Sequence, residues 1–438
     1  MRSVVLFTRD LRVHDHPALM EAVRTSDDVV PLFVLDPRLM EVSPNRARFL
    51  LEGLIELDRS LAQRGGRLVV RHGEAAAVVP ALAGECEAAR VFVTADATAV
   101  ARRREAALAR RLGSAGIELR TMGGNGVVEP GDVAPAGKGA YVVFTPYHRA
   151  WSAAPRRSVL PAPVRIAVPD DVRSDPLPDP RSLAVEAFDL PAGGERHGRR
   201  QLDMFLRTHA ASYGELRDDM AADATSRLSP YLRLGFVSAN EVAYRASRVE
   251  GADGFVRQLA WRDFFGQLLW HDPRLAWTDL RPGPEMPATS GVPTEALKLW
   301  KEGLTGLPLV DAGMRQLKRE GWIHNRARMV VASFLTRRLA IPWQEGYRHF
   351  MRHLVDGDPA NNAGGWQWVA GTGTDPRRSR SFNPVRQAQR FDPRGDYVRR
   401  YVRELADVPA PLIFAPWKDP ALLQSHAYPE PLIPVPVD

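Results

Sequence analysis

Cysteine is nearly absent from this chain of 438 residues, because Cys86 is the only one. A single cysteine excludes an internal disulfide framework and any zinc or iron–sulfur site built from several thiolates. No uncharged stretch reaches the ~18 residues that a membrane-spanning helix needs. The N-terminal sequence MRSVVLFTRDLRVHD is charged too early for a signal peptide. We therefore expect a soluble cytoplasmic protein with no metal site and no membrane partner.

Lysine is also scarce. Of 59 basic residues only five are lysines, at positions 138, 298, 301, 318 and 418, which leaves 54 arginines and a net charge of +7. Arginine-rich codon use in a GC-rich genome explains this excess, and so does contact with phosphate, because a guanidinium forms paired hydrogen bonds with phosphate oxygens. Composition by itself favours the genomic explanation.

Tryptophan is almost missing from the first part of the chain, where Trp151 is the only one of ten before residue 260. The chain is also about three times as long as a typical domain. We therefore expect two domains of different construction, over residues 1–130 and 198–438, with a long surface linker over 131–197.

Short apolar runs alternate with amphipathic segments through the first domain. The predicted strands are Ser3–Thr8, Val29–Asp36, Arg67–Arg71, Arg90–Thr94 and Ile117–Thr121, and the predicted helices are Pro17–Thr25, Asn45–Gln63, Glu74–Leu82 and Ala99–Leu112. This alternation predicts a doubly wound parallel sheet, a Rossmann-like α/β fold that binds ligands at the carboxyl ends of its strands. No GxGxxG motif follows the first strand, which argues against an ordinary dinucleotide site.

Residues 150–195 are rich in proline and lack periodicity, as is typical of a surface linker. Beyond Gly198 the strand signals vanish. Helical spacing recurs over 198–211, 238–249, 255–269, 293–301, 310–320, 324–339 and 343–355. The second domain is therefore predicted to be nearly all-helical.

Polar side chains gather at three places in the helical domain. The hydroxyls of Thr225–Ser229 suit a phosphate, although this segment by itself favours an ordinary capped helix start. The run His324-Asn325-Arg326-Ala327-Arg328 lies between apolar flanks, so either its charges have buried partners or the run is a solvated helix face. The carboxylates Asp356 and Asp358 are the expected partners, one for Arg328 and one for a ligand. A calcium loop would need further oxygen ligands that this segment lacks.

Aromatic side chains share helix faces with polar ones. Gln258, Trp261, Arg262 and Phe265 form one helical stripe, which suits a stacked base better than a core, although an ordinary buried helix remains the alternative. Trp366 and Trp368 are separated by about 200° on a helix, so one can face the interior while the other lines a cavity. Two core tryptophans are the alternative there.

Together these segments resemble the DNA photolyase/cryptochrome family, most closely its bacterial cyclobutane pyrimidine dimer photolyases. The resemblance rests on TSRLSPYL (225–232), QLAWRDFF (258–265), TGLPLVDAGMRQLKREGWIHNRARMVVASF (305–334), DGDPANNAGGWQWVAGTGTD (356–375) and the opening FTRDLRVHDHPAL (7–19). It implies an α/β antenna domain and a helical FAD-binding domain. In such photolyases excited, fully reduced FAD donates an electron to a flipped-out dimer in UV-damaged DNA, and the cyclobutane ring splits.

The resemblance also implies roles for residues at matching positions. The implied cofactor contacts are Tyr213, Thr225, Ser226, Arg227, Leu228, Ser229, Arg328, Asp356, Gly357, Asp358 and Asn362. Within this set Arg328 and Asp356 are the ion pair beside the isoalloxazine, and Asn362 faces flavin N5. The implied lesion and DNA contacts are Gln258, Trp261, Arg262, Phe265, Asn325, Arg326, Trp368 and Gln387. Trp366 and Trp343 match the first two members of a tryptophan relay that reduces the flavin.

The chain departs from the family pattern at two places. Position 258 holds Gln where bacterial cyclobutane-dimer enzymes usually have Glu, which is more like photolyases for (6-4) photoproducts. Those enzymes use two histidines where this chain has Asn325 and Met329, so a cyclobutane dimer is favoured. The third relay tryptophan is expected between Trp277 and Trp300, yet residues 278–299 contain no aromatic residue. The electron therefore leaves by another aromatic residue, or photoreduction is slow.

A second chromophore is implied as well. The strand residues 32–37, Asp96 and Arg102–Arg104 are more like those of family members that use an 8-hydroxy-5-deazaflavin than those that use methenyltetrahydrofolate. The alternative functions are a cryptochrome-type photoreceptor without repair activity and a (6-4) photolyase. The short proline-rich stretch after Lys418 is unlike a long cryptochrome tail, and an ordinary flavin oxidoreductase would need a nicotinamide site that we do not find. The acid-free stretches 321–340 and 376–390 form the expected DNA-facing strip of a monomer.

Overall fold

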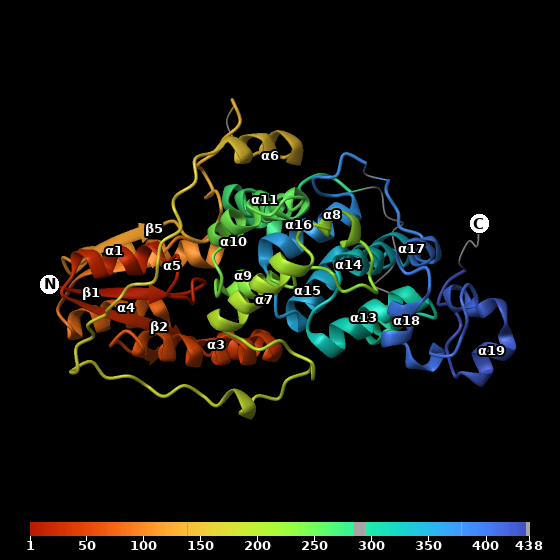
Figure 1. Cartoon of the computed structure of the whole chain (residues 1–438), viewed down its shortest axis with the longest axis horizontal. Coiled ribbons are helices and arrows are strands. Elements are labelled where there is room, and N and C mark those ends of the chain that lie inside the picture. The colour runs from red at the N-terminus through yellow and green to blue at the C-terminus, as the bar shows by residue number, and fades with distance from the viewer. Residues whose placement is uncertain (138, 284–293, 378, 435–438) are drawn as a thin grey trace. The chain divides into compact units, whose positions relative to one another are not determined.

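The computed structural model describes residues 1–137, 139–283, 294–377 and 379–434. Among these residues there is one β-sheet, which has five parallel strands: β1 (Arg2–Phe7), β2 (Asp28–Leu35), β3 (Val69–His72), β4 (Ala88–Thr94) and β5 (Glu118–Met122). The strands lie in the order β3-β2-β1-β4-β5 (Figure 1). The strand order reverses between β1 and β4. This is the doubly wound topology that the sequence predicts, and ligands bind such sheets at the point of reversal.

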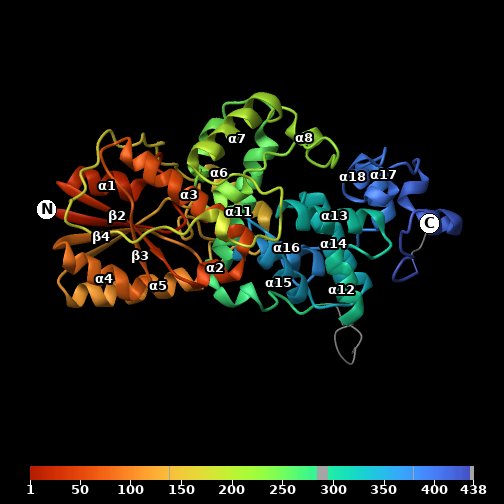
Figure 2. The ribbon, with the colours of Figure 1, turned by 90° about the horizontal axis from the view of Figure 1, so that it is seen from below.

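Helices cover both faces of the sheet. In Figure 2, α1 (Pro17–Thr25) and α3 (Pro44–Ala62) lie on one face, and α4 (Ala75–Glu85) and α5 (Ala99–Ser114) lie on the other. The short helix α2 (Arg38–Val42) precedes α3. Because both faces are covered, β1 and β2 are buried along nearly their whole length, and their sequences are continuous apolar runs.

Beyond β5 the regular elements of the described chain are helices, as predicted for residues 198–438. Six helices precede residue 272: α6 (Phe144–Ala153), α7 (Glu195–Thr208), α8 (Tyr213–Leu216), α9 (Ser229–Leu234), α10 (Ala239–Ala246) and α11 (Asp253–His271). Eight follow: α12 (Thr294–Glu302), α13 (Pro308–Glu320), α14 (Asn325–Ser333), α15 (Trp343–His353), α16 (Pro359–Ala370), α17 (Pro384–Phe391), α18 (Asp396–Tyr401) and α19 (Pro420–Ser425). The predicted helix 324–339 ends as a π-helical turn over Phe334–Arg338. The predicted helix start at Pro293 lies outside the described residues.

The chain forms two compact units. The first contains residues 1–185, 191–214 and 226–274, and the second contains 186–190, 215–225 and 275–438. The first unit therefore combines the sheet with α6, α7 and α9–α11, whereas the predicted domain boundary lies at residues 131–197. Within that predicted linker α6 is a regular helix that packs on α11. Of the described residues, no helix is long and apolar enough to cross a membrane.

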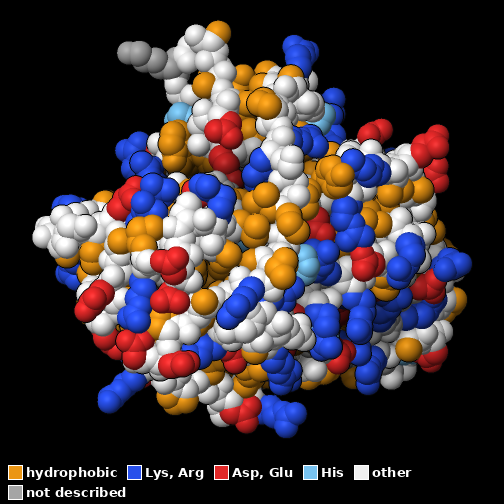
Figure 3. All heavy atoms as spheres, turned by 60° about the vertical axis from the view of Figure 1, so that its left-hand side comes forward, with side chains coloured by type: hydrophobic (Ala, Val, Ile, Leu, Met, Phe, Trp, Pro, Cys, Tyr) orange, Lys and Arg blue, Asp and Glu red, His pale blue; other side chains and the backbone are white. Residues whose placement is uncertain are grey.

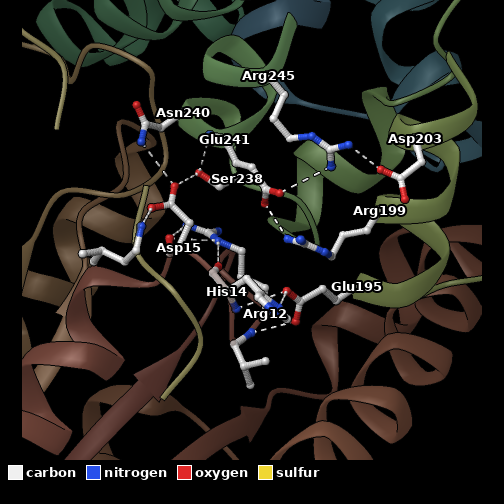
Figure 4. A network of polar contacts seen from close by, with 12 residues as sticks. Arg12, His14, Asp15, Glu195, Arg199, Asp203, Ser238, Asn240, Glu241 and Arg245 are labelled. Carbon is white, nitrogen blue, oxygen red and sulfur yellow. Dashed lines mark hydrogen bonds and ion pairs between the residues drawn. The ribbon is translucent and has the colours of Figure 1, made fainter. Parts of the chain in front are cut away.

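A buried arginine connects the sheet to the helices of the first unit (Figure 4). Arg12 follows β1 and is only 1% exposed. Its guanidinium donates hydrogen bonds to the carbonyls of Asp15 (2.9 Å), Gly124 (2.9 Å) and Gly235 (3.0 Å). These carbonyls belong to the loops after β1 and β5 and to the end of α9. One side chain thus fixes three segments that are distant in the sequence.

Asp15 continues this network. Its carboxylate accepts hydrogen bonds from Arg157 Nη2 (2.8 Å), from the Leu160 amide (2.9 Å) and from the Ser238 hydroxyl. Burial by itself raises the pKa of a carboxyl group, but the hydrogen bonds from Arg157 and Ser238 hold the pKa of Asp15 below its ordinary value. Asp15 also has a φ of 50°, a left-handed conformation that Asp and Asn tolerate best among residues with a Cβ.

The network predicts an effect of Asp15→Asn on stability. Asparagine keeps the shape and tolerates the positive φ, but it removes the charge that accepts from Arg157. We expect the free energy of unfolding to fall by roughly 2 kcal/mol, the scale of hydrogen bonds to charged groups. Urea unfolding followed by circular dichroism measures the change. Asp27→Asn is the control, because it removes the charge of an exposed ion pair with the N-terminal amine, on a side chain that is 86% exposed. Such exposed pairs contribute little to stability, so the midpoint should stay nearly unchanged. Equal shifts for both variants would contradict the prediction.

Candidate functional site

The predicted site residues fall on both compact units, and the second unit holds the pair at residues 328 and 356. Arg328, on α14, donates from Nη2 to Asp356 Oδ2 at 2.7 Å and from Nε to the Ile323 carbonyl at 2.9 Å. The Asp356 side chain is only 3% exposed. Its other oxygen, Oδ1, is buried and has no hydrogen-bond partner among the described residues. The predicted ion pair is confirmed, and it leaves a carboxylate oxygen available to a ligand.

The start of α16 positions two further predicted contacts. Asp358 caps this helix, because its Oδ1 accepts from the amide of Asn361 and from the Asn361 side chain, both at 2.9 Å. Asn362 follows one turn later, is 9% exposed and donates from Nδ2 to the Tyr347 carbonyl at 3.2 Å. The cap fixes the start of the helix, so the Asn362 amide has a defined orientation.

Trp366 lies in the core of the second unit. It is 3% exposed, and its ring centre lies 5.1 Å from that of Phe350 and 6.2 Å from that of Trp300. A Cβ atom at Gly346 would lie 2.0 Å from the Trp366 ring, so glycine is required where α15 passes this indole. Trp366 Nε1 is buried without a hydrogen-bond partner among the described residues. The indole is therefore tightly held while its N–H remains available.

Trp343 is the second residue of the implied relay and is also buried, with 4% exposure. Its Nε1 donates to Asp279 Oδ1 at 2.7 Å. Gln344, the next residue of α15, donates to the carbonyl of Trp277, whose own side chain is 59% exposed. The sequence singled out neither Asp279 nor Trp277. Residues 284–293 of the stretch expected to hold a third relay tryptophan lie outside the described residues.

Trp368 is only partly buried, unlike Trp366, as their angular separation on a helix predicts. The Arg380 guanidinium lies 4.8 Å from its ring centre, and Arg380 Nε lies 3.1 Å from Asp375 Oδ2. A groove of about 630 Å³ adjoins this position; it is lined by Pro376, Arg377, Ser379, Arg380, Ser381, Phe382 and Gln387. Arginines beside an aromatic face suit a nucleic-acid strand, since they pair with phosphates while the ring stacks on a base.

Arg326, on α14, contacts Gln387, which lines the same groove. Its Nη2 lies 2.8 Å from Asp218 Oδ1, its Nη1 donates to Gln387 Oε1 at 3.5 Å, and its Cζ lies 4.2 Å from the Phe391 ring centre. Asn325 begins α14 and is exposed. The second unit thus brings together Arg326 and Gln387 from the predicted DNA contacts. Arg380 lies in the stretch 376–390 that the sequence predicts to face DNA, whereas Asp218 was missed, because its partner Arg326 is distant in the sequence.

The first unit holds the remaining predicted cofactor contacts. Tyr213 packs edge-on against Phe205 and Phe255, at 5.9 and 5.5 Å between ring centres. In the run Ser226–Ser229, Arg227 has a φ of 50°, Ser226 Oγ accepts from the Leu228 amide at 3.3 Å, and α9 begins at Ser229. Thr225, which clusters with the second unit, has a buried hydroxyl without a hydrogen-bond partner in the described part of the chain. A capped helix start alone does not explain that hydroxyl.

The predicted stripe of α11 lies in the first unit. Trp261 and Phe265 are in contact, with ring centres 5.6 Å apart, and Gln258 Nε2 donates to the Gly254 carbonyl at 3.4 Å. Arg262 is bound to the adjacent Asp263, at 3.0 Å between Nη1 and Oδ1. Burial raises the pKa of Asp263, although the Arg262 charge opposes the shift. Arg262 therefore already has a partner within its own helix.

The arginine excess is not confined to these elements. Figure 3 shows lysine and arginine side chains spread widely over one face of the molecule, with acidic side chains among them. Such a distribution supports the genomic explanation for most arginines. The arginines that carry a functional argument are those with aromatic or carboxylate contacts, such as Arg326, Arg328 and Arg380.

Comparisons with known proteins agree with this architecture. Residues 3–166 match the family model described as DNA photolyase, and residues 255–436 match the model described as the FAD binding domain of DNA photolyase. A deoxyribodipyrimidine photo-lyase from Streptomyces griseus is 49% identical over 98% of this chain and 96% of its own length. The structure of a bacterial class III photolyase from Agrobacterium tumefaciens has a TM-score of 0.91 and 33% identity, over 99% of this chain and 94% of that one. A cryptochrome structure from Synechocystis sp. PCC6803 also has a TM-score of 0.91, with 28% identity over 99% and 97% of the two chains.

These matches identify the protein class. An α/β domain with a parallel five-stranded sheet precedes a helical FAD-binding domain, and the chain belongs to the DNA photolyase family.

Proposed function

We propose that this protein repairs cyclobutane pyrimidine dimers in UV-damaged DNA by light-driven electron transfer. The observation that carries the proposal is the buried carboxylate of Asp356, which pairs with Arg328 through Oδ2 and leaves Oδ1 without a partner among the described residues. The relative that is 49% identical bears the name deoxyribodipyrimidine photo-lyase. When bound, reduced FAD supplies the electron that opens the cyclobutane ring after it absorbs light.

The residues present fit FAD. Asp356 Oδ1 and the Thr225 hydroxyl are buried polar atoms that await a partner, as expected where a polar ligand completes the site. Arg328 would orient Asp356 so that Oδ1 accepts an N–H of the flavin ring. Asn362 would present its amide to flavin N5, Gly357 and Asp358 would add contacts, and Tyr213 with Ser226–Ser229 would hold the phosphates and ribose.

In the second unit the DNA would meet the arginine-lined groove and the partly exposed indole of Trp368. Arg326 and Gln387 would contact the strand, with Asn325 beside them, and Trp368 and Trp261 would hold the dimer bases by stacking. Gln258 can donate an N–H to a base carbonyl, but it cannot move a proton as Glu can. Asn325 and Met329 supply no proton donor of the histidine type, so a cyclobutane dimer suits the site better than a (6-4) photoproduct.

In the electron relay, Trp366 would be the member nearest the flavin, and Trp343 would supply the electron that restores Trp366. Each indole is buried, so each is shielded from water while it passes an electron. The Trp343 N–H already donates to Asp279, which can receive the proton when this indole is oxidised. A cryptochrome-type photoreceptor would share these features, and the likeness to the Synechocystis cryptochrome keeps that function as the second candidate.

We further propose a deazaflavin antenna in preference to a folate, bound at the strand-order reversal of the sheet. Arg104 Nε and Nη2, Glu105 Oε1 and the Thr8 hydroxyl are buried without hydrogen-bond partners among the described residues. Burial also raises the pKa of Glu105. An oxygen-rich chromophore would satisfy these groups, with Asp96 beside them in its ion pair with Arg9 at 3.0 Å.

The antenna proposal predicts the absorption spectrum of protein purified from a deazaflavin-producing host. A second visible band should accompany the flavin bands, and mass spectrometry of the released chromophore should identify a deazaflavin. Arg104→Ala should lose that band and keep the flavin, whereas Arg110→Ala, at an exposed position of the same helix, should keep both. Release of a folate, or a second band that persists in Arg104→Ala, would contradict the antenna site.

The repair proposal predicts loss of dimers only in the light. Reduced, flavin-bound protein should restore intact thymines in an irradiated oligonucleotide under blue light, as measured by chromatography, and should do nothing in the dark. A (6-4)-containing oligonucleotide is the control substrate and should remain unchanged. Flavin-bound protein that repairs neither lesion would favour the photoreceptor function.

Two substitutions should separate DNA binding from flavin chemistry. Arg326→Ala removes a phosphate contact, so the affinity for dimer-containing DNA should fall about tenfold. The slope of the logarithm of affinity against the logarithm of salt concentration should become shallower by about one, because one counterion fewer is released. Asn362→Ala should change the rate of flavin photoreduction with thiol and leave DNA affinity within twofold. Arg394→Ala, at a side chain that is 82% exposed, is the matched control. If both site variants lose only DNA affinity, the assignment of Asn362 is wrong.

A further inference from the structure

The helix α6 brings an aromatic ring directly onto Trp261. Phe144, the first residue of α6, stacks on the Trp261 ring with 3.7 Å between ring centres and 5° between ring planes. Phe144 is 6% exposed, whereas Trp261 remains half-buried. One face of the indole is therefore closed by a parallel ring. A base can stack only on the other face.

We infer that Phe144 is a positioning residue that sets the plane of Trp261 for the damaged base. This inference rests on the proposed function, in which Trp261 stacks on the dimer. A tryptophan side chain turns about two torsions, and the outer torsion has a broad energy minimum. A ring packed in parallel removes this freedom before DNA binds. Less conformational entropy is then lost on binding, which strengthens the selection of the lesion.

The surrounding contacts fix Phe144 itself. The Arg257 guanidinium lies 5.0 Å from the Phe144 ring centre, and Phe264 meets Phe144 and Trp261 nearly at right angles, at 5.6 and 5.5 Å. Phe144 and Trp261 thus share one perpendicular neighbour. A rotation of the Trp261 plane would break the stack with Phe144 and the edge contact with Phe264 together, so the plane is held from two directions.

The rest of α6 is attached through residues other than Trp261. Tyr147 packs on Phe264 at 5.3 Å and on Tyr141 at 5.7 Å, and Trp151 donates from Nε1 to Asp263 Oδ2 at 3.0 Å. These contacts hold the helix to the same unit without touching the Trp261 ring face. Tyr147 is therefore a matched control, because it is a buried aromatic residue of the same helix that shares the neighbour Phe264 but does not stack on Trp261.

The test compares Phe144→Leu, Phe144→Tyr and Tyr147→Leu in flavin-bound protein. Fluorescence anisotropy gives Kd for an oligonucleotide with one thymine dimer and for the same oligonucleotide undamaged. Leucine fills space but offers no ring plane. The ratio of Kd for undamaged DNA to Kd for dimer-containing DNA should therefore fall about tenfold in Phe144→Leu. Phe144→Tyr and Tyr147→Leu should keep the ratio within twofold. Single-turnover repair at saturating DNA should stay within twofold in every variant, because Phe144 touches no reacting atom.

Several results would overturn the inference. A Phe144→Leu protein that keeps the wild-type ratio would do so, and so would an equal loss in Tyr147→Leu. Phe144→Met provides the same comparison if Phe144→Leu does not retain flavin, since methionine is flexible and also lacks a ring plane. Wild-type protein without any preference for the dimer would refute the proposed function, and this inference with it. A wild-type preference that survives in the Phe144 variants would refute this inference alone.

Discussion

A buried guanidinium must find all its hydrogen-bond acceptors within the protein, and Arg12 imposes this requirement on the first unit. Its acceptors are carbonyls after β1, after β5 and at the end of α9, so the carboxyl edge of the sheet and the helices are held at one point. Burial lowers the pKa of the Arg12 guanidinium, while nearby carboxylates such as Asp10 oppose the shift. Removal of any one acceptor loop would leave part of this charge unsatisfied. The sheet therefore cannot form its native edge without the helical segments of the same unit.

The second unit contains two buried aspartates that illustrate how structural and functional carboxylates differ. Asp311 accepts from the amide and hydroxyl of Thr305, from the Gly306 amide and from the Tyr428 hydroxyl, so its oxygens are satisfied by the chain. Asp356 is equally buried, yet only Oδ2 is bonded and Oδ1 has no partner among the described residues. Because an unpaired buried oxygen is unfavourable, its persistence points to a ligand. The same reasoning applies to Thr225 and to the Arg104–Glu105 pair.

Much of the fold could be predicted because its signals are local. The strands β1, β2 and β4 are continuous apolar runs, and their predicted ends agree with the structure to within two residues. The pairing of Arg328 with Asp356 could be predicted because apolar flanks on both sides demand a buried partner. Helix α6 could not be predicted, because it lies within residues 131–197, which were predicted to be a linker between two domains. The partners of Arg326 and Trp343, which are Asp218 and Asp279, are likewise invisible in a local pattern.

The sequence by itself determined the α/β and helical halves, the buried charges and the family, since these follow from periodicity, burial and motifs of neighbouring residues. Only the tertiary structure decided which polar atoms are left without partners and that Phe144 covers one face of Trp261. The stack of Phe144 on Trp261 joins residues more than a hundred positions apart. Such contacts are set by how the helices pack, because a side chain's own sequence neighbours do not specify what lies across from it.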